Sequence, residues 1–125
     1  MKSIVEKLTI SLFLIVFLLA TWSALIQTGP SITQRETINI GWSSRTLQDF
    51  LKQGAQYFMK IDYMNSDQVN EARQGFPDLQ KAYPENRNVW TLVWEVRTPD
   101  GTWLSLRQVI DDETGSIINE GAVTN

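Results

Sequence analysis

The clearest alternation of hydrophobic and polar residues lies between residues 89 and 119. Residues 89–97, 102–110 and 116–119 read VWTLVWEVR, TWLSLRQVI and SIIN, and the first two runs alternate between apolar and polar side chains. A two-residue period is typical of strands with one buried face. The Thr-Pro-Asp-Gly at residues 98–101 favours a tight turn, because proline presets φ and glycine can take a positive φ. The sequence therefore predicts a three-stranded antiparallel meander.

The length of this turn sets the register of the first two strands. A three-residue loop at residues 99–101 places apolar residues opposite each other, whereas a four-residue loop would set Trp94 against Ser105. We adopt the three-residue loop, because a slip of one residue would turn the whole apolar set to the wrong side. The predicted buried face, interrupted only by Gln108, comprises Trp90, Leu92, Trp94, Val96, Leu104, Leu106 and Ile110.

A helix over residues 44–63 has the periodicity needed to cover this face. Ser44 can cap its first turn, and apolar residues then follow at steps of three and four. Gly54 falls on the stripe, where it either lets the helix approach the sheet closely or merely weakens the helix. The stripe comprises Leu47, Phe50, Leu51, Gly54, Ala55 and Phe58.

The remaining segments are shorter. Residues 36–42 are interpreted as a short strand or an extended lead-in, and residues 66–73 as a second helix capped by Ser66. Residues 76–88 are predicted to form a loop with one helical turn from Pro77, pinned to the core by Phe76, Leu79 and Tyr83. The expected fold is α+β, with one main helix packed on a three-stranded antiparallel meander in a domain of residues 36–120, followed by a tail at 121–125.

Residues 8–26 carry no charge and predict a transmembrane anchor. A helix rising about 1.5 Å per residue would nearly cross a hydrocarbon core of about 30 Å with this length. Lys2 and Lys7 precede the span and Arg35 is the first cation after it, so the positive-inside rule places residues 1–7 in the cytoplasm and the domain outside the cell membrane, beyond a tether at 27–35. A cleaved signal peptide is the alternative, but small residues are poorly placed for cleavage.

Composition narrows the function further. The chain has no cysteine and no histidine, which excludes Ser-His-Asp and Cys-His catalysis, the usual zinc sites and disulfides. With 11 basic and 14 acidic residues, its net charge of −3 is a poor match for nucleic acid. We predict no catalytic, cofactor or metal-binding residues.

Two groups of polar residues have structural interpretations. Asp111, Asp112 and Glu113 invite a calcium or catalytic-acid hypothesis, but three adjacent residues cannot all converge on one cation. A turn in which Asp111 accepts from backbone N–H groups is favoured instead. Glu95 and Arg107 are predicted to form an ion pair across the outer face of the hairpin.

The outer face of the hairpin holds the predicted binding site. Trp103 falls among polar residues beside Arg97, and Val93, Val109 and Arg107 share its side of the strands. Tryptophan is favoured at interfaces. We therefore expect an exposed strip of these five residues to contact a partner.

Residues 89–119 resemble a PepSY domain, a small extracytoplasmic bacterial module. In that family an alternating strand, an x-D-G turn and a second strand lead to a D-x-x-T-G motif and a short apolar strand. Here the turn is PDG, the motif is DDETG from Asp111 to Gly115, and SIIN follows. A single membrane-anchored copy is also similar to small cell-envelope regulators of Gram-positive bacteria. The resemblance implies a non-catalytic domain that binds or restrains an envelope protein, such as a peptidase or a cell-wall enzyme.

Two other functions stay open at this point. The first is a small-ligand module of the cystatin-like or NTF2-like kind, which would need a cavity lined by Trp90 and Trp94. The second is a carboxylate-dependent hydrolase that uses the acidic residues named above. Nothing in the sequence predicts an oligomeric state.

Overall fold

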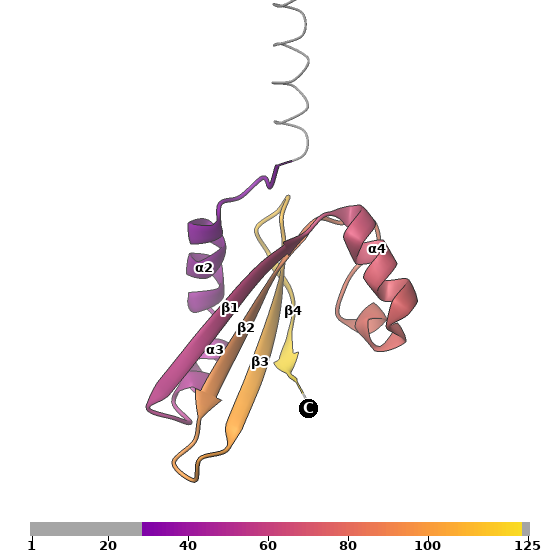
Figure 1. The fold of residues 1–125 in the computed structure, drawn as a ribbon. Coiled ribbons are helices and arrows are strands. Elements are labelled where there is room, and N and C mark those ends of the chain that lie inside the picture. Colours follow the sequence, from indigo (N-terminus) through magenta and orange to yellow (C-terminus); the bar gives the residue numbers. More distant parts are fainter. Residues whose placement is uncertain (1–28, 124–125) are drawn as a thin grey trace, which may run out of the picture.

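The computed structural model describes residues 29–123, which form a four-stranded antiparallel sheet with three α-helices and one 3-10 helix (Figure 1). The strand order β1-β2-β3-β4 follows the chain, so the sheet is a meander. The α+β class is confirmed, but the sheet has one strand more than predicted. In chain order the elements are α2 (Gln34–Trp42), α3 (Arg45–Leu51), β1 (Gln56–Met64), α4 (Ser66–Gly75), η1 (Pro77–Lys81), β2 (Val89–Arg97), β3 (Trp103–Asp111) and β4 (Ile117–Ala122).

The predicted register of the β2–β3 hairpin is confirmed. Val96 lies opposite Leu104, and Trp94 lies opposite Leu106. The turn closes through a bond from the Gly101 N–H to the Thr98 carbonyl at 2.9 Å, and Gly101 has a φ of 87°. Only glycine takes this φ without strain, so the turn sequence fixes the pairing.

The long helix predicted over residues 44–63 is wrong beyond its first two turns. Ser44 does cap α3, which then ends at Leu51, and the chain continues as strand β1. From Phe58 to Tyr63 the residues alternate between exposed and half-buried positions, and residues 57–63 include three aromatic side chains and an isoleucine, which favour a strand. Gly54 does mark a close approach, but in the turn before β1, where a Cβ would lie 2.1 Å from the Arg97 carbonyl oxygen.

The strand predicted at residues 36–42 is also wrong, because these residues belong to helix α2. The hydroxyl of Thr33 accepts from the Glu36 N–H at 3.1 Å and caps the helix. Thr33 and Glu36 have the spacing of a capping box, a helix-start pattern. Gly41 faces the sheet, where a Cβ would lie 2.4 Å from a methyl of Leu92, so α2 packs tightly against the strands.

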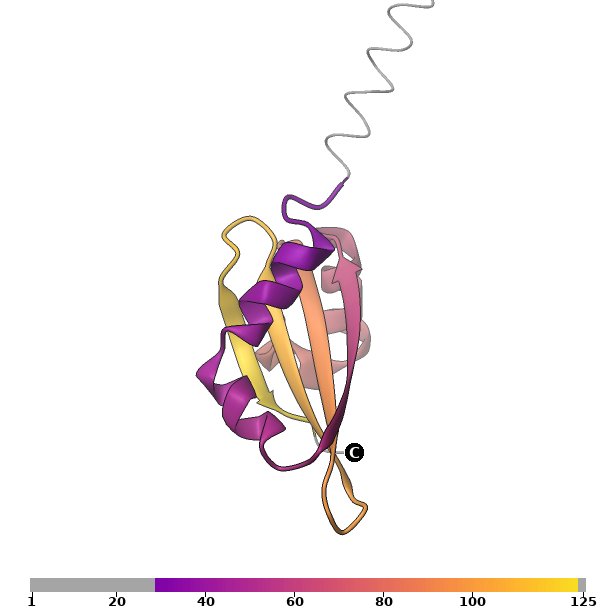
Figure 2. The same ribbon diagram turned by 90° about the vertical axis from the view of Figure 1, so that its left-hand side faces the viewer.

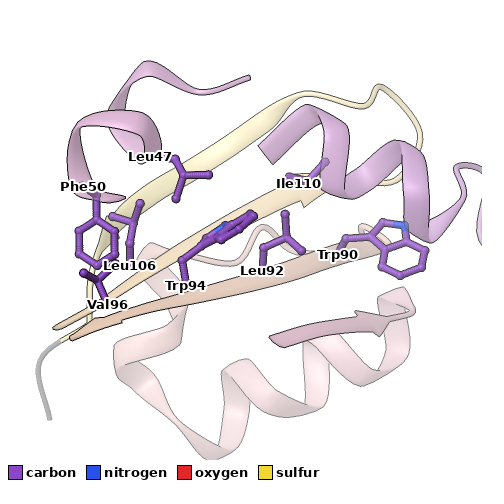
Figure 3. Close-up of a cluster of buried hydrophobic side chains, with 8 residues drawn as sticks. All are labelled: Leu47, Phe50, Trp90, Leu92, Trp94, Val96, Leu106 and Ile110. Carbon is purple, nitrogen blue, oxygen red and sulfur yellow. The ribbon is translucent and has the colours of Figure 1, made fainter. Parts of the chain in front are cut away.

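Helices α2 and α3 cover one face of the sheet and bury the main core beneath them (Figures 2 and 3). The predicted shielding of the tryptophan face is therefore confirmed, with two short helices in place of one long helix. Trp94 is 2% exposed, and its indole N–H donates to Gln108 at 2.7 Å. Gln108 in turn donates to the Gly41 carbonyl at 3.0 Å, which joins sheet and helix. The core comprises Leu47, Phe50, Trp90, Leu92, Trp94, Val96, Leu106 and Ile110.

Helix α4 and η1 lie on the opposite face and form a second, smaller core (Figure 1). The predicted short helix is confirmed, but its cap is Asn65 rather than Ser66. The helical turn from Pro77 is confirmed as η1. Phe76 was expected to pin this loop but is 66% exposed. The second core comprises Val69, Ala82, Tyr83, Val89 and Val109.

The predicted anchor at residues 8–26 lies outside the described residues. Between residues 29 and 123, no helix is long and apolar enough to cross a membrane. The folded domain is slightly larger than the predicted 36–120, because α2 begins at Gln34 and β4 ends at Ala122.

Candidate functional site

The helices cover the two faces of the sheet unequally, and this leaves a candidate binding surface. On the face opposite α2 and α3, α4 and η1 bury Val89 and Val109 near one end of the strands. Within residues 29–123, no helix covers the half of that face next to the β2–β3 turn. We call this half the open face; it comprises Phe58, Lys60, Val93, Glu95, Arg97 and Trp103.

Two exposed aromatic side chains dominate the open face. Phe58 is 57% exposed and Trp103 is 43% exposed. Their ring centroids lie 5.5 Å apart although they come from β1 and β3, so the pair reaches across the middle strand β2. The guanidinium of Arg97 lies 6.0 Å from the Trp103 ring. The two ring planes are inclined by 42°, and this aromatic pair beside a cation combines apolar area with charge, as protein-binding surfaces do.

One ion pair crosses the open face. Lys60 on β1 contacts the carboxylate of Glu95 on β2 at 3.3 Å. The predicted partner of Glu95, Arg107, instead packs its guanidinium 5.4 Å from the ring of Tyr83. Because residues 65–88 cross over this end of the sheet, Arg107 is drawn toward them and away from Glu95.

The structure divides the predicted partner-binding strip. Trp103 and Arg97 are exposed as expected, and Val93 and Arg107 are half-buried. Val109 was expected at the surface but is fully buried, because Val69 and Tyr83 pack over it. The pattern of β3 alone placed Val109 on the correct face, but it gave no sign that α4 and η1 cover that end.

Two hollows border the open face. One of about 470 Å³ lies beyond the end of β4, between Phe50, Trp103 and Val123. Another of about 340 Å³ lies between β1, β2 and η1, where Leu79 and Val93 line it. The face is therefore uneven, with the aromatic pair standing between two depressions.

A small-ligand module was expected to enclose a cavity lined by Trp90 and Trp94. The hollows of about 280 to 470 Å³ that open at the surface of residues 29–123 include four that neither Trp90 nor Trp94 lines. The ring of Trp94 instead packs 5.8 Å from Trp42 and 6.0 Å from Tyr57.

The first acidic residue of the turn after β3, Asp111, stabilises that turn. Asp111 receives two bonds from Arg87, at 3.0 and 2.7 Å, and one from the Thr114 N–H at 3.0 Å. Burial raises the pKa of Asp111, but the hydrogen bonds from Arg87 and Thr114 outweigh it and hold that pKa below its ordinary value. Gly115 has a φ of 69°, as the predicted turn requires. Asp111 is therefore committed to the turn.

Asp112 has a role that the sequence did not indicate. Its buried carboxylate accepts from the Trp90 indole at 3.0 Å and from the N–H groups of Ser31 and Ile32 at 2.8 and 3.2 Å. It thereby fastens the segment before α2 to the end of the sheet. Burial and the negative charge of Asp112 raise the pKa of Tyr63, which lies beside Trp90.

The described part of the chain contains no group of acidic side chains arranged to bind a metal ion. Across residues 29–123, no three acidic side chains gather where they could hold an ion. Glu113, the third acidic residue of the turn, points to Arg87 at 3.5 Å.

Phe58 is the residue of the open face that the sequence analysis missed. It was placed on the apolar stripe of a helix, where it would have been buried. The signal that identifies it is the alternation over residues 57–64, in which Phe58, Lys60 and Asp62 share the solvent side.

Comparison of the chain with protein-family models, with curated proteins and with solved structures finds no significant match.

Proposed function

We propose that this chain is a non-catalytic binding module, anchored to the cell membrane by residues 8–26, that captures a cell-envelope protein with its open face. The observation that carries the proposal is the contact between the aromatic rings of Phe58 and Trp103, which stay exposed on a face whose other half is buried. Tryptophan and arginine are the residues that most often dominate binding energy at interfaces. Trp103 and Arg97 lie side by side here.

The resemblance to PepSY domains supports the class of partner. It points to a peptidase or a cell-wall enzyme outside the membrane, which the module binds or restrains. The acidic residues of the D-x-x-T-G turn support a non-catalytic role, because Asp111 and Asp112 are both buried and bonded within the fold.

Photo-crosslinking in intact cells tests this proposal with the full chain. A benzophenone amino acid at position 103 should capture a defined protein. The same probe at position 42 is the matched control, since Trp42 is also 43% exposed but lies on helix α2, on the other side of the sheet. Equal capture from both positions, or none from position 103, would refute the proposed use of the open face.

A substitution separates binding from folding. Trp103→Ala should reduce capture by a probe at position 58 at least about tenfold, as expected for an interface hot spot. The domain should still unfold cooperatively, because Trp103 is exposed. Unfolding of the variant without denaturant would show that Trp103 serves the core.

A further inference from the structure

Among the described residues, strand β1 is a long and regular edge of the sheet. It has nine residues, and its pairing with β2 is uninterrupted from Gln56 to Met64. The other edge strand, β4, has six residues and pairs with β3 through a bulge at Val109/Ile110. Short length and bulges block edge-to-edge association, whereas a long regular edge invites another strand. Figure 2 shows β1 at the margin of the sheet, to one side of α2 and α3.

The backbone groups that β1 presents outward can be identified from the hairpin. The Thr98 N–H donates to the Thr102 carbonyl at 2.8 Å, so even-numbered residues of β2 bond to β3 and odd-numbered residues bond to β1. Register then leaves the N–H and C=O groups of Tyr57, Met59, Ile61 and Tyr63 facing away from the sheet. The Tyr63 N–H accordingly donates to the side chain of its neighbour Asp62 at 2.9 Å.

The side chains along this edge form a palindrome of chemical types. Residues 58–64 read FMKIDYM, with Ile61 at the centre, Lys60 and Asp62 on either side, and apolar residues beyond them. An antiparallel copy centred on Ile61 would set Lys60 opposite Asp62 of the second copy, and Phe58 opposite Met64. Each charge then meets its opposite and each apolar side chain meets another, which stabilises a strand pair.

We propose that β1 pairs antiparallel with β1 of a second copy of this chain, about a two-fold axis at Ile61, which makes one continuous sheet from two domains. Such an interface is isologous, as in most homodimers. The outward groups of Ile61 bond to those of Ile61 in the second copy, and those of Met59 bond to those of Tyr63. This interface uses the edge of β1, whereas the proposed function uses the open face; Phe58 and Lys60 belong to both.

Charge selects this register over its neighbours. A two-fold axis at Lys60 would set the two lysines directly opposite each other, and an axis at Asp62 would do the same to the two carboxylates, which is destabilising. An axis at Met59 would set Lys60 against Phe58. Only the axis at Ile61 pairs every charged residue of this edge with its opposite.

Charge reversal tests the register with the full chain in mild detergent. Lys60→Glu and Asp62→Lys each place like charges opposite each other, so each variant alone should dimerise at least about tenfold more weakly than the natural protein. Mixed together, they restore opposite charges at both positions and should form a heterodimer. Lys52→Glu is the matched control, because Lys52 directly follows α3, away from β1, and its side chain is 78% exposed, against 74% for Lys60.

Sedimentation velocity across a concentration series reads out the dimer, and chemical unfolding verifies that each variant is folded. The proposal predicts a dimer for the natural protein and for Lys52→Glu, monomers for the two β1 variants, and recovery on mixing. A monomeric natural protein would overturn it. So would dimers that persist in both β1 variants, which place the contact elsewhere, or a mixture that stays monomeric.

Discussion

Replacing Asp112 with alanine should lower the free energy of unfolding by about 3 kcal/mol. The substitution leaves the buried Trp90 indole N–H without a partner, at about 1–3 kcal/mol, and removes two charge-assisted bonds to backbone N–H groups worth about 1.5–3 kcal/mol each. The carboxylate is itself fully buried, so its removal also relieves a desolvation penalty of several kcal/mol. Subtracting this relief from the lost hydrogen bonds leaves a net loss of about 3 kcal/mol.

A double-mutant cycle isolates the bond to the indole. Trp90→Phe removes the donor, so Asp112→Ala should cost about 1–2 kcal/mol less in that background than in the natural protein. Tryptophan fluorescence during guanidinium unfolding of the full chain gives the four free energies. Hydrogen exchange at Ser31 and Ile32 should also accelerate in Asp112→Ala. An equal loss in both backgrounds, or unchanged exchange, would refute the role assigned to Asp112.

Three further substitutions probe other parts of the fold. Trp94→Ala should cost about 3–5 kcal/mol in chemical unfolding, because Trp94 is 2% exposed; a loss below about 1 kcal/mol would place it outside the core. Gly54→Ala should cost about 1–3 kcal/mol, whereas Gly75→Ala, where a Cβ meets nothing within 4 Å, should be neutral or stabilising; similar effects at both sites would contradict the close approach. Asp111→Asn should cost about 1.5–3 kcal/mol at neutral pH. The pKa of Asp111 is lower in the folded than in the unfolded chain, so the stability difference between the natural protein and Asp111→Asn should shrink as the pH falls below the ordinary pKa of 3.8. A stability difference that persists in acid would show that the charge is not what stabilises the turn.

Local chemistry explains why the hairpin could be predicted and the first half of the domain could not. The β2–β3 register depends on one turn and on the apolar alternation of the two strands beside it. All of these features lie close together in the sequence. Residues 44–58 instead satisfy both a helical stripe and, from Tyr57, a two-residue alternation. Gly54 favours the strand over a longer helix, because its missing side chain lets the chain pass the Arg97 carbonyl and turn into β1. That contact joins residues far apart in the sequence.

The candidate site was predicted in part for the same reason. Alternation placed Trp103 and Arg97 on the outer face, and both are exposed. The burial of Val109 and the contact between Phe58 and Trp103 depend on which segments cross that face. Both contacts were hidden from a strand pattern that considers only its own residues.

The detour of the chain between β1 and β2 has a consequence for folding kinetics. Strands β2, β3 and β4 follow one another through short turns, so their pairing closes small loops and is entropically cheap. Strand β1 must wait for residues 65–88 to fold back before it can join, and non-local pairing of this kind slows folding. We therefore expect β2, β3 and β4 to form the folding nucleus and β1 to dock last. Until β1 docks, the edge of β2 that will bond to it is unpaired. A nascent chain is most prone to aggregate in that interval.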